Sequence, residues 1–201
     1  MKIDFKHALL EHTKAIESVL VQSDKIEAVV QKIIESIAGG GKVIWLGNGG
    51  SAADAQHMAA ELMVRYVKNR QPIASISLTT DTSILTAHSN DYSFDTVFSR
   101  QIEGLASLQD VVIGLSTSGE SVNVIKALEA ANQKGCFTVA MTGGGQGELS
   151  LLKRGCSGAE NSLSQLSDLC LQVHSNETAR VQEAHSFISH LICEGLDSVF
   201  E

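Results

Sequence analysis

A histidine and a glutamate four residues apart, His57 and Glu61, have types and a spacing that could support chemistry. Residues at positions i and i+4 of a helix share one face, so this pair could bind a metal ion or act as an acid–base pair. The same spacing is more often a surface histidine beside a solvated glutamate. Arg65, one turn after Glu61, is either a cation beside this acidic group or a surface ion-pair partner.

A second polar pair, Gln182 and His190, lies near the C-terminus. On a helix, eight residues correspond to about 12 Å along the axis and about 80° around it. The two side chains could therefore meet one metal ion only if both reached inward along the axis, or if subunits shared the site. A histidine in an apolar stripe is more often a hydrogen-bonded core residue.

The segment that must position His57 and Glu61 starts with an apolar run and a glycine turn. Residues 43–46 (VIWL) are predicted to form a buried strand, and Gly47-Asn48-Gly49-Gly50 a tight turn. Ser51 is the predicted N-cap of a helix that continues towards residue 66. Because free N–H groups and the positive end of the helix dipole point into such a turn, we expect residues 48–51 to bind an anion.

A second strand–loop–helix unit covers residues 111–133. The apolar strand 111–115 is followed by four hydroxyl side chains and then by a helix at 122–133; the four are Ser116, Thr117, Ser118 and Ser121. Taken alone, a serine-rich turn usually reflects capping. Two such turns at the carboxyl ends of parallel strands favour a ligand site, where hydroxyl and N–H groups surround a phosphate.

Strands and helices alternate through the rest of the chain. We predict two helices within residues 4–39, strands at 73–78, 137–141 and 169–173, mixed helical pieces at 81–108, a glycine-rich loop at 142–147, a long segment at 151–168 and a closing helix at 177–200. This pattern is typical of a three-layer, doubly wound α/β fold with a five-stranded parallel sheet. We expect one domain over 1–201, with N-terminal helices in 1–39 and an α/β core in 40–201. The helix pair either packs on its own sheet or forms a subunit interface.

Composition excludes several classes of protein. The 201 residues carry a formal charge of −8, with 43% hydrophobic and 19% charged residues, which argues against disorder and against binding to nucleic acids or acidic membranes. The four cysteines show no C-x-x-C spacing, so a zinc knuckle or redox pair is not indicated. The chain has no predicted signal peptide or membrane span, and we expect it in the cytoplasm.

Three segments resemble the signatures of sugar isomerase (SIS) domains of the phosphoheptose isomerase kind. They are GNGGSAADAQHMAAEL at 47–62, LSTSGESVNVIKAL at 115–128 and ARVQEAHSFISH at 179–190. The resemblance covers nearly the whole chain, and it implies a homotetramer with active sites at subunit interfaces. It also implies isomerisation of sedoheptulose 7-phosphate to D-glycero-D-manno-heptose 7-phosphate through an enediol, the first step towards the heptose of lipopolysaccharide or another surface polysaccharide.

The resemblance also assigns roles by position. It implies substrate contacts from Asn48, Gly49, Gly50, Ser51, Arg65, Asn90, Asp91 and Gln182, and phosphate contacts from Ser116, Thr117, Ser118 and Ser121. It implies one zinc ion per subunit, held by His57, Glu61, Gln182 and His190, with Glu61 and His190 as the catalytic pair. Whether Glu61 acts as the base or only as a metal ligand stays open.

Two alternatives belong to other functional classes. One is a non-enzymatic SIS paralogue that associates with the replication initiator DnaA and lacks the catalytic positions; Glu61 and His190 argue against it. The other is a SIS isomerase or sugar-sensing module for a different phosphosugar.

Overall fold

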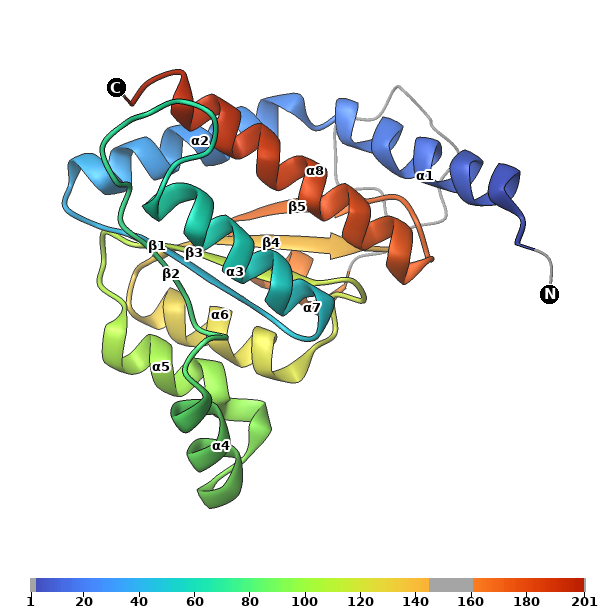
Figure 1. The fold of residues 1–201 in the computed structure, drawn as a ribbon. Coiled ribbons are helices and arrows are strands. Elements are labelled where there is room, and N and C mark those ends of the chain that lie inside the picture. The colour runs from blue at the N-terminus through green and yellow to red at the C-terminus, as the bar shows by residue number, and fades with distance from the viewer. Residues whose placement is uncertain (1–2, 145–160, 201) are drawn as a thin grey trace.

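A computed structural model describes residues 3–144 and 161–200 of the chain. Figure 1 shows a sheet covered by helices on both faces. The helices are α1 (Phe5–Leu20), α2 (Ser23–Ala38), α3 (Gly50–Met63), α4 (Thr82–Asp91), α5 (Val97–Leu105), α6 (Val122–Gln133), α7 (Ser162–Leu166) and α8 (Thr178–Asp197), with a 3-10 turn at Phe94–Thr96. The strands are β1 (Val43–Gly47), β2 (Ser75–Ser77), β3 (Val111–Ser116), β4 (Phe137–Gly143) and β5 (Leu169–Val173).

The five strands form one parallel sheet in the order β2-β1-β3-β4-β5. The strand order reverses direction next to β1, which places β1 and β3 at the centre of a doubly wound sheet. All side chains of β1 and β3 are buried, as expected for parallel strands covered on both faces. The predicted fold class is therefore confirmed.

Alternate residues of each strand feed two separate cores. On one face, Val43 and Trp45 pack with apolar residues of α1, α2, α3 and α8. On the other face, Ile44 and Leu46 pack with α5, α6 and α7. The period of two in the strands thus places α3 and α8 together on the same face of the sheet.

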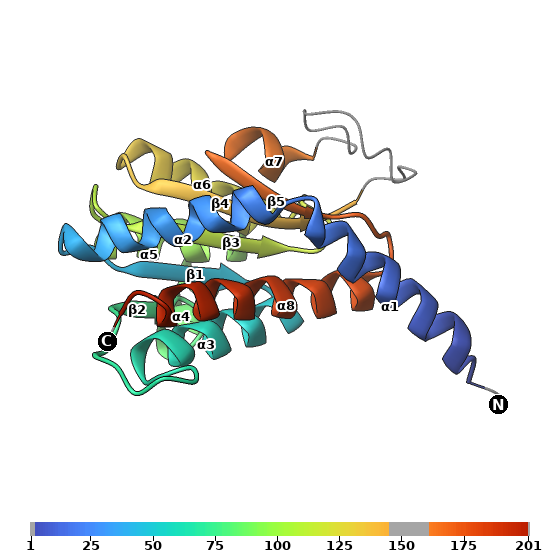
Figure 2. The same ribbon diagram turned by 90° about the horizontal axis from the view of Figure 1, so that it is seen from above.

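The N-terminal helices belong to the α3–α8 layer. Ile26, Val29 and Ile33 of α2 are buried in that core, so α2 packs on its own sheet as one of the two predictions had it. The first turns of α1 extend beyond the body of the molecule (Figure 2), and Phe5 there is 75% exposed.

Local details differ from the sequence predictions. Helix α3 starts at Gly50 after Gly49, which has a φ of +57°, so Ser51 lies buried inside the first turn and the N-cap prediction was wrong. A left-handed glycine allows the chain to enter the helix two residues earlier than a serine cap. Thr142 and Gly143 extend β4 rather than opening a loop. Helix α7, with a capping box at Asn161, was not predicted, and residues 145–160, which hold most of the two predicted loop segments, lie outside the described residues.

Candidate functional site

Three of the helices that follow strands share an open N-terminus at the carboxyl edge of the sheet. Helix α3 follows β1, α6 follows β3 and α8 follows β5, and none of the three has a hydrogen bond from a capping side chain at its N-terminus. Helix N-termini carry N–H groups and the positive end of the helix dipole. This edge is therefore suited to bind an anion without a positively charged side chain.

An amide pair ties the first two of these turns together. Asn48, after β1, and Asn123, in the first turn of α6, exchange two hydrogen bonds, with Nδ2 to Oδ1 distances of 2.7 and 2.8 Å. Sequence reasoning singled out Asn48 but not Asn123, because the two residues are distant in the chain. The pair fixes the glycine turn against the hydroxyl-rich loop.

The predicted hydroxyl side chains do gather at the end of β3. The Ser116 Oγ lies 2.8 Å from the Ser121 Oγ and 3.4 Å from the Ser118 Oγ, and it accepts a hydrogen bond from the Gly119 N–H. The Ser118 Oγ accepts from the Glu120 N–H at 3.2 Å. Ser118 is exposed, so its hydroxyl is open to a ligand, whereas Ser116 is buried behind it.

A cavity of about 200 Å³ lies beside these hydroxyl groups. Its lining combines the β3 loop with the start of α8 and consists of Thr117, Ser118, Gly144, Ser175, Asn176 and Thr178. The residues from the α8 side were missed by sequence reasoning. The polar run after the fifth strand was the available signal, since it follows a strand end just as Ser116 does.

Helices α3 and α8 run parallel and meet at successive levels. At the N-terminal ends of the two helices, here called the mouth of the site, a Cβ atom built on Gly50 would come within 2.1 Å of the Gln182 amide, so a larger residue would force that side chain to move. One turn further, the Ser186 hydroxyl donates to Asp54 Oδ1 at 2.9 Å. At the next level the rings of His57 and His190 meet edge to face, with centroids 5.2 Å apart.

The predicted reactive side chains meet at this last level. The His57 Nε2 lies 3.1 Å from the Glu61 Oε1. The Glu61 side chain is 22% exposed and that of His57 47%, so the pair is reachable from solvent. Tyr66, which sequence reasoning did not select, stacks on His190 with centroids 5.5 Å apart. The structure thus brings His57, Glu61 and His190 together from two helices.

Buried groups around this cluster have shifted pKa values. Burial raises the pKa of the Asp54 carboxyl, against the opposing effects of the Ser186 hydrogen bond and of His57 and His190. Burial, with a smaller contribution from Glu61, raises the pKa of the Cys193 thiol to about 12. The cluster of His57, Glu61 and His190 therefore lies next to the buried core at Cys193, with the partly buried carboxyl group of Asp54 beside it.

Imidazole, carboxylate and amide groups are all known zinc ligands or close analogues of them. Within 3–144 and 161–200, no group of three or more histidine, cysteine, aspartate or glutamate side chains is arranged to hold a metal ion. Gln182 packs on Gly50, about 12 Å along the α8 axis from His190. Of the four predicted ligands, His57, Glu61 and His190 are therefore neighbours, whereas Gln182 lies beside Gly50 at the N-terminal ends of α3 and α8.

Two other sets of predicted residues lie apart from this cluster. The Arg65 guanidinium donates to the Val67 carbonyl at 3.3 Å, and the side chain is exposed. Asn90 and Asp91 end α4, where the Asn90 amide donates to Asp91 at 2.9 Å. Figure 1 shows α4 projecting from the α5 side of the molecule, away from α3 and α8.

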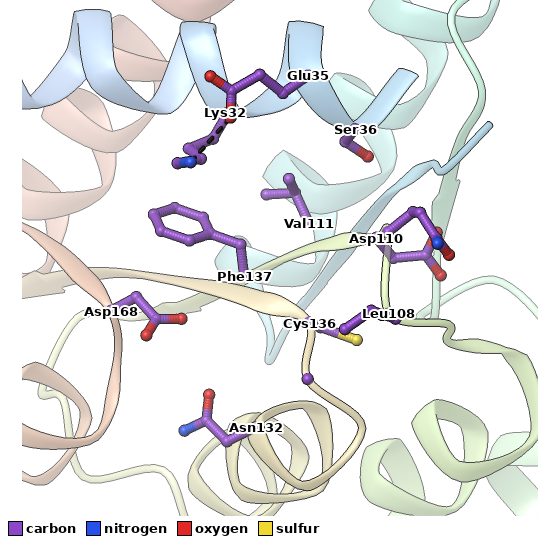
Figure 3. Close-up of a pocket in the computed structure, with 12 residues that line it drawn as sticks. Lys32, Glu35, Ser36, Leu108, Asp110, Val111, Asn132, Cys136, Phe137 and Asp168 are labelled. Carbon is purple, nitrogen blue, oxygen red and sulfur yellow. Dashed lines mark hydrogen bonds and ion pairs between the residues drawn. The ribbon is translucent and has the colours of Figure 1, made fainter. Parts of the chain in front are cut away.

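A second hollow lies elsewhere on the described surface. A depression of about 560 Å³ lies at the amino ends of β3 and β4, between α2 and the loops that lead into these strands (Figure 3). Its charged side chains already have partners: Lys32 pairs with Glu35 at 2.8 Å, Asp110 pairs with Lys42 at 2.7 Å, and Asp168 accepts hydrogen bonds from the N–H and hydroxyl groups of Thr138. Since ligands of such sheets bind at the carboxyl edge, we assign the functional site there and not to this hollow.

No helix in the described ranges combines the length and apolar character needed to span a membrane.

Comparison with protein families gives a match to the SIS domain over residues 5–143. The phosphoheptose isomerase of Campylobacter concisus is 43% identical over 200 residues, covering 100% of this chain and 98% of the relative. The probable phosphoheptose isomerase of Thermoplasma acidophilum is 43% identical over 198 residues, covering 98% of this chain and 100% of the relative.

Solved structures agree with these relatives. The phosphoheptose isomerase GmhA from Neisseria gonorrhoeae has a TM-score of 0.83 at 36% identity, covering 96% of this chain and 97% of that one. A phosphoheptose isomerase from Francisella tularensis has a TM-score of 0.81 at 28% identity, covering 96% and 94%. The SIS-domain match, the 43% identity over nearly the whole chain and the similarity to solved structures lead to one conclusion: the chain belongs to the phosphoheptose isomerases of the SIS-domain family.

Proposed function

We propose that the protein interconverts sedoheptulose 7-phosphate and D-glycero-D-manno-heptose 7-phosphate, as an early step of heptose synthesis in the cytoplasm. The observation that carries this proposal is the meeting of His57, Glu61 and His190 on two parallel helices whose N-termini open at the hydroxyl-lined edge. An open-chain sugar phosphate has its carbonyl and its phosphate at opposite ends, and α3 serves both parts of such a site. It begins at the glycine turn and presents His57 about 10 Å further along its axis.

The phosphate end is assigned to the carboxyl edge of the sheet. Ser118 and Thr117 line the cavity there, and the uncapped start of α6 lies directly behind them. Neutral hydroxyl and N–H donors suit a protein with a formal charge of −8, because they bind a phosphate without relying on overall charge. Asn48, Gly49, Gly50 and Ser51 would contact the substrate next to this group.

Glu61 and His190 are assigned to proton transfer. The reaction moves one proton from C1 to C2 through an enediol and a second proton between the two oxygens. Glu61 would remove and return the carbon-bound proton, and His190 would serve the oxygens from the facing helix. His57 hydrogen-bonds to Glu61, which holds the carboxylate in one orientation.

One zinc ion per subunit is part of the proposal. His57, Glu61, Gln182 and His190 have donor chemistry that suits zinc, and three of them are neighbours. A bound zinc ion would polarise the substrate carbonyl and stabilise negative charge on its oxygen.

The homotetramer with shared active sites is also a proposal, and α4 supports it. No residue of α4 is buried, and the α4 region exposes Ile84, Tyr92 and Phe94. Asn90 and Asp91 lie at its end, away from the α3–α8 cluster of their own chain. We infer that they reach the site of a neighbouring subunit.

The decisive experiment compares turnover of sedoheptulose 7-phosphate by the wild type and by Glu61→Gln. We expect the variant to lose at least about a thousandfold in kcat while it still binds the sugar phosphate, because the amide cannot accept a proton. Retained turnover would remove Glu61 from the reaction. Turnover by the wild type with chelator and with added zinc, combined with metal analysis of the purified protein, tests the zinc assignment separately.

Mixed oligomers test the shared site. Glu61→Gln and Asn90→Ala would each be inactive alone, but a mixture refolded together should regain activity, since some sites then combine two intact contributions. An active Asn90→Ala variant would place Asn90 outside the site, and a mixture as inactive as its components would contradict a site shared between subunits.

A further inference from the structure

A buried ion pair joins the segment that follows α3 to the C-terminal end of α8. The Arg70 Nε donates to Asp197 Oδ1 at 2.7 Å, and the two side chains are 0% and 5% exposed. A buried pair of this kind contributes little net stability compared with apolar residues of the same size. Its value is more often geometric, because it holds two elements in one relative position.

Arg70 also binds the end of the helix that carries Glu61. Its Nη2 donates to the Glu61 carbonyl and one Nη1 bond goes to the Leu62 carbonyl, both at 2.9 Å. These carbonyls belong to the last turn of α3, where no following N–H of the helix is available to them. The guanidinium therefore caps α3 at the backbone of Glu61 itself.

Asp197 holds the segment after α3 with its second oxygen. The Oδ2 accepts from the backbone N–H groups of Val67 and Lys68, both at 2.9 Å. Tyr66 immediately precedes these two residues, and its ring stacks on His190. The Asp197 carboxylate therefore holds the backbone next to Tyr66, and the ring of Tyr66 in turn contacts the imidazole of His190.

We propose that Arg70 and Asp197 are positioning residues, which fix the register between α3 and α8 so that Glu61 and His190 keep their relative placement. They touch no reacting atom, and the inference rests on the roles proposed above for Glu61 and His190. A shift of about 1 Å between catalytic groups lowers rates by roughly a hundredfold, so a loosened pair affects kcat. The anion-binding hydroxyls belong to the β3 loop and stay in place.

The test is the double variant Arg70→Met/Asp197→Leu, which removes both buried charges together. Removing both charges avoids a single unpaired buried charge, which is the more destabilising change. Circular dichroism first checks that the variant folds, because the pair also bonds backbone groups at the end of α3 and in the segment after it. Arg70→Lys is the conservative partner, because it keeps the charge but replaces the planar fork of the guanidinium with three donors on a single nitrogen. The matched control is Arg100→Met/Glu103→Leu, which removes an exposed pair on α5.

We expect the double variant to lose about 10- to 100-fold in kcat, with KM for sedoheptulose 7-phosphate within about twofold of wild type. The kcat of Arg70→Lys should lie between those of the double variant and the wild type. The control should match the wild type in both kcat and KM. The pH profile of kcat should also change shape, because it reports the groups whose placement was altered. A purely structural role would lower the melting temperature and leave these values, measured per folded enzyme, unchanged.

Unchanged kcat in the folded double variant, or a rise in KM as large as the fall in kcat, overturns the inference. Glu61→Gln is assayed in parallel to separate the two levels of the argument. If Glu61→Gln stays active, the proposed catalytic roles fail. If it is inactive while the double variant behaves as wild type, only the positioning role of Arg70 and Asp197 fails.

Discussion

The ring of Tyr66 lies nearly parallel to the imidazole of His190, with 20° between the planes and 5.5 Å between the centroids. Tyr66 lies three residues after the end of α3, and His190 belongs to α8. The stack therefore links the segment that follows α3 to α8, beside the cluster of His57, Glu61 and His190. It restricts the rotation of the imidazole, because a tilted ring would lose contact with the phenol.

Tyr66→Leu should therefore lower kcat more than it changes KM. An aromatic pair contributes about 0.5–1.5 kcal/mol beyond its buried area, which corresponds to about a two- to tenfold loss. Tyr66→Phe keeps the ring and should stay near wild type. Steady-state kinetics with both variants decides the question, and equal losses in Leu and Phe would point to the hydroxyl group instead of the stack.

Gly50→Ala should weaken substrate binding. The added Cβ would meet the Gln182 amide at 2.1 Å and displace it from the mouth of the site. If Gln182 contacts substrate, KM rises severalfold while the fold is retained. Gly104→Ala is the control, because nothing lies within 4 Å of a Cβ at that position. Wild-type kinetics in both variants would show that substrate binding does not depend on the position of the Gln182 amide.

Ser118→Ala should raise KM with little effect on kcat. Ser118 is exposed and lines the cavity at the end of β3, so its hydroxyl is assigned to the phosphate and not to the reacting carbons. Loss of one hydrogen bond to a charged group costs about 1.5–3 kcal/mol, or roughly 10- to 150-fold in affinity. Titration with inorganic phosphate as a competitor gives a second readout. Ser107→Ala, at an exposed serine between α5 and β3 on the opposite edge of the sheet, serves as the control.

His185 makes stability depend on pH. Burial lowers the pKa of this imidazole from 6.5 to about 4, against the smaller, opposing effect of the Thr142 backbone. Between these pH values the unfolded chain binds a proton that the folded protein does not. The free energy of unfolding should therefore fall as the pH drops from 6.5 towards 4, by up to about 3 kcal/mol, and be fully restored above that window.

Urea unfolding of His185→Gln measures this contribution by difference. The variant should lose the dependence on pH in that window, whereas His7→Gln, a substitution at an exposed histidine of α1, should keep it.

Asp197 contributes to the pH dependence of stability in a separate, more acidic range. Burial would raise its pKa, but hydrogen bonds from Lys68, Arg70 and Val67 bring the pKa below 3.8, so its effect is lost only in stronger acid.

Local sequence patterns were sufficient for most of the fold. The helix at 122–133 and the strand at 169–173 were predicted with their observed bounds, because continuous apolar runs and helical periodicity are local properties. The start of α3 was misplaced by two residues, because the decisive feature is a backbone angle of Gly49 and not a side-chain preference.

The assembly of the site depended on contacts that local patterns do not contain. Arg70 and Asp197 are 127 residues apart, and Asn48 and Asn123 are 75 apart. Nothing in either neighbourhood indicates its partner. Spacing also could not place Gln182, because its position follows from the register of α8 against α3, which is set by packing in the core.

The separation between the two edges of the sheet gives a practical route for labelling. The amino edge holds the depression of Figure 3, with its paired charges, and the turn from α6 into β4 passes beside it. Gln133 is exposed there, at the opposite end of α6 from Asn123. A fluorophore or affinity handle attached through Gln133→Cys would report on the molecule from the side that substrate does not approach.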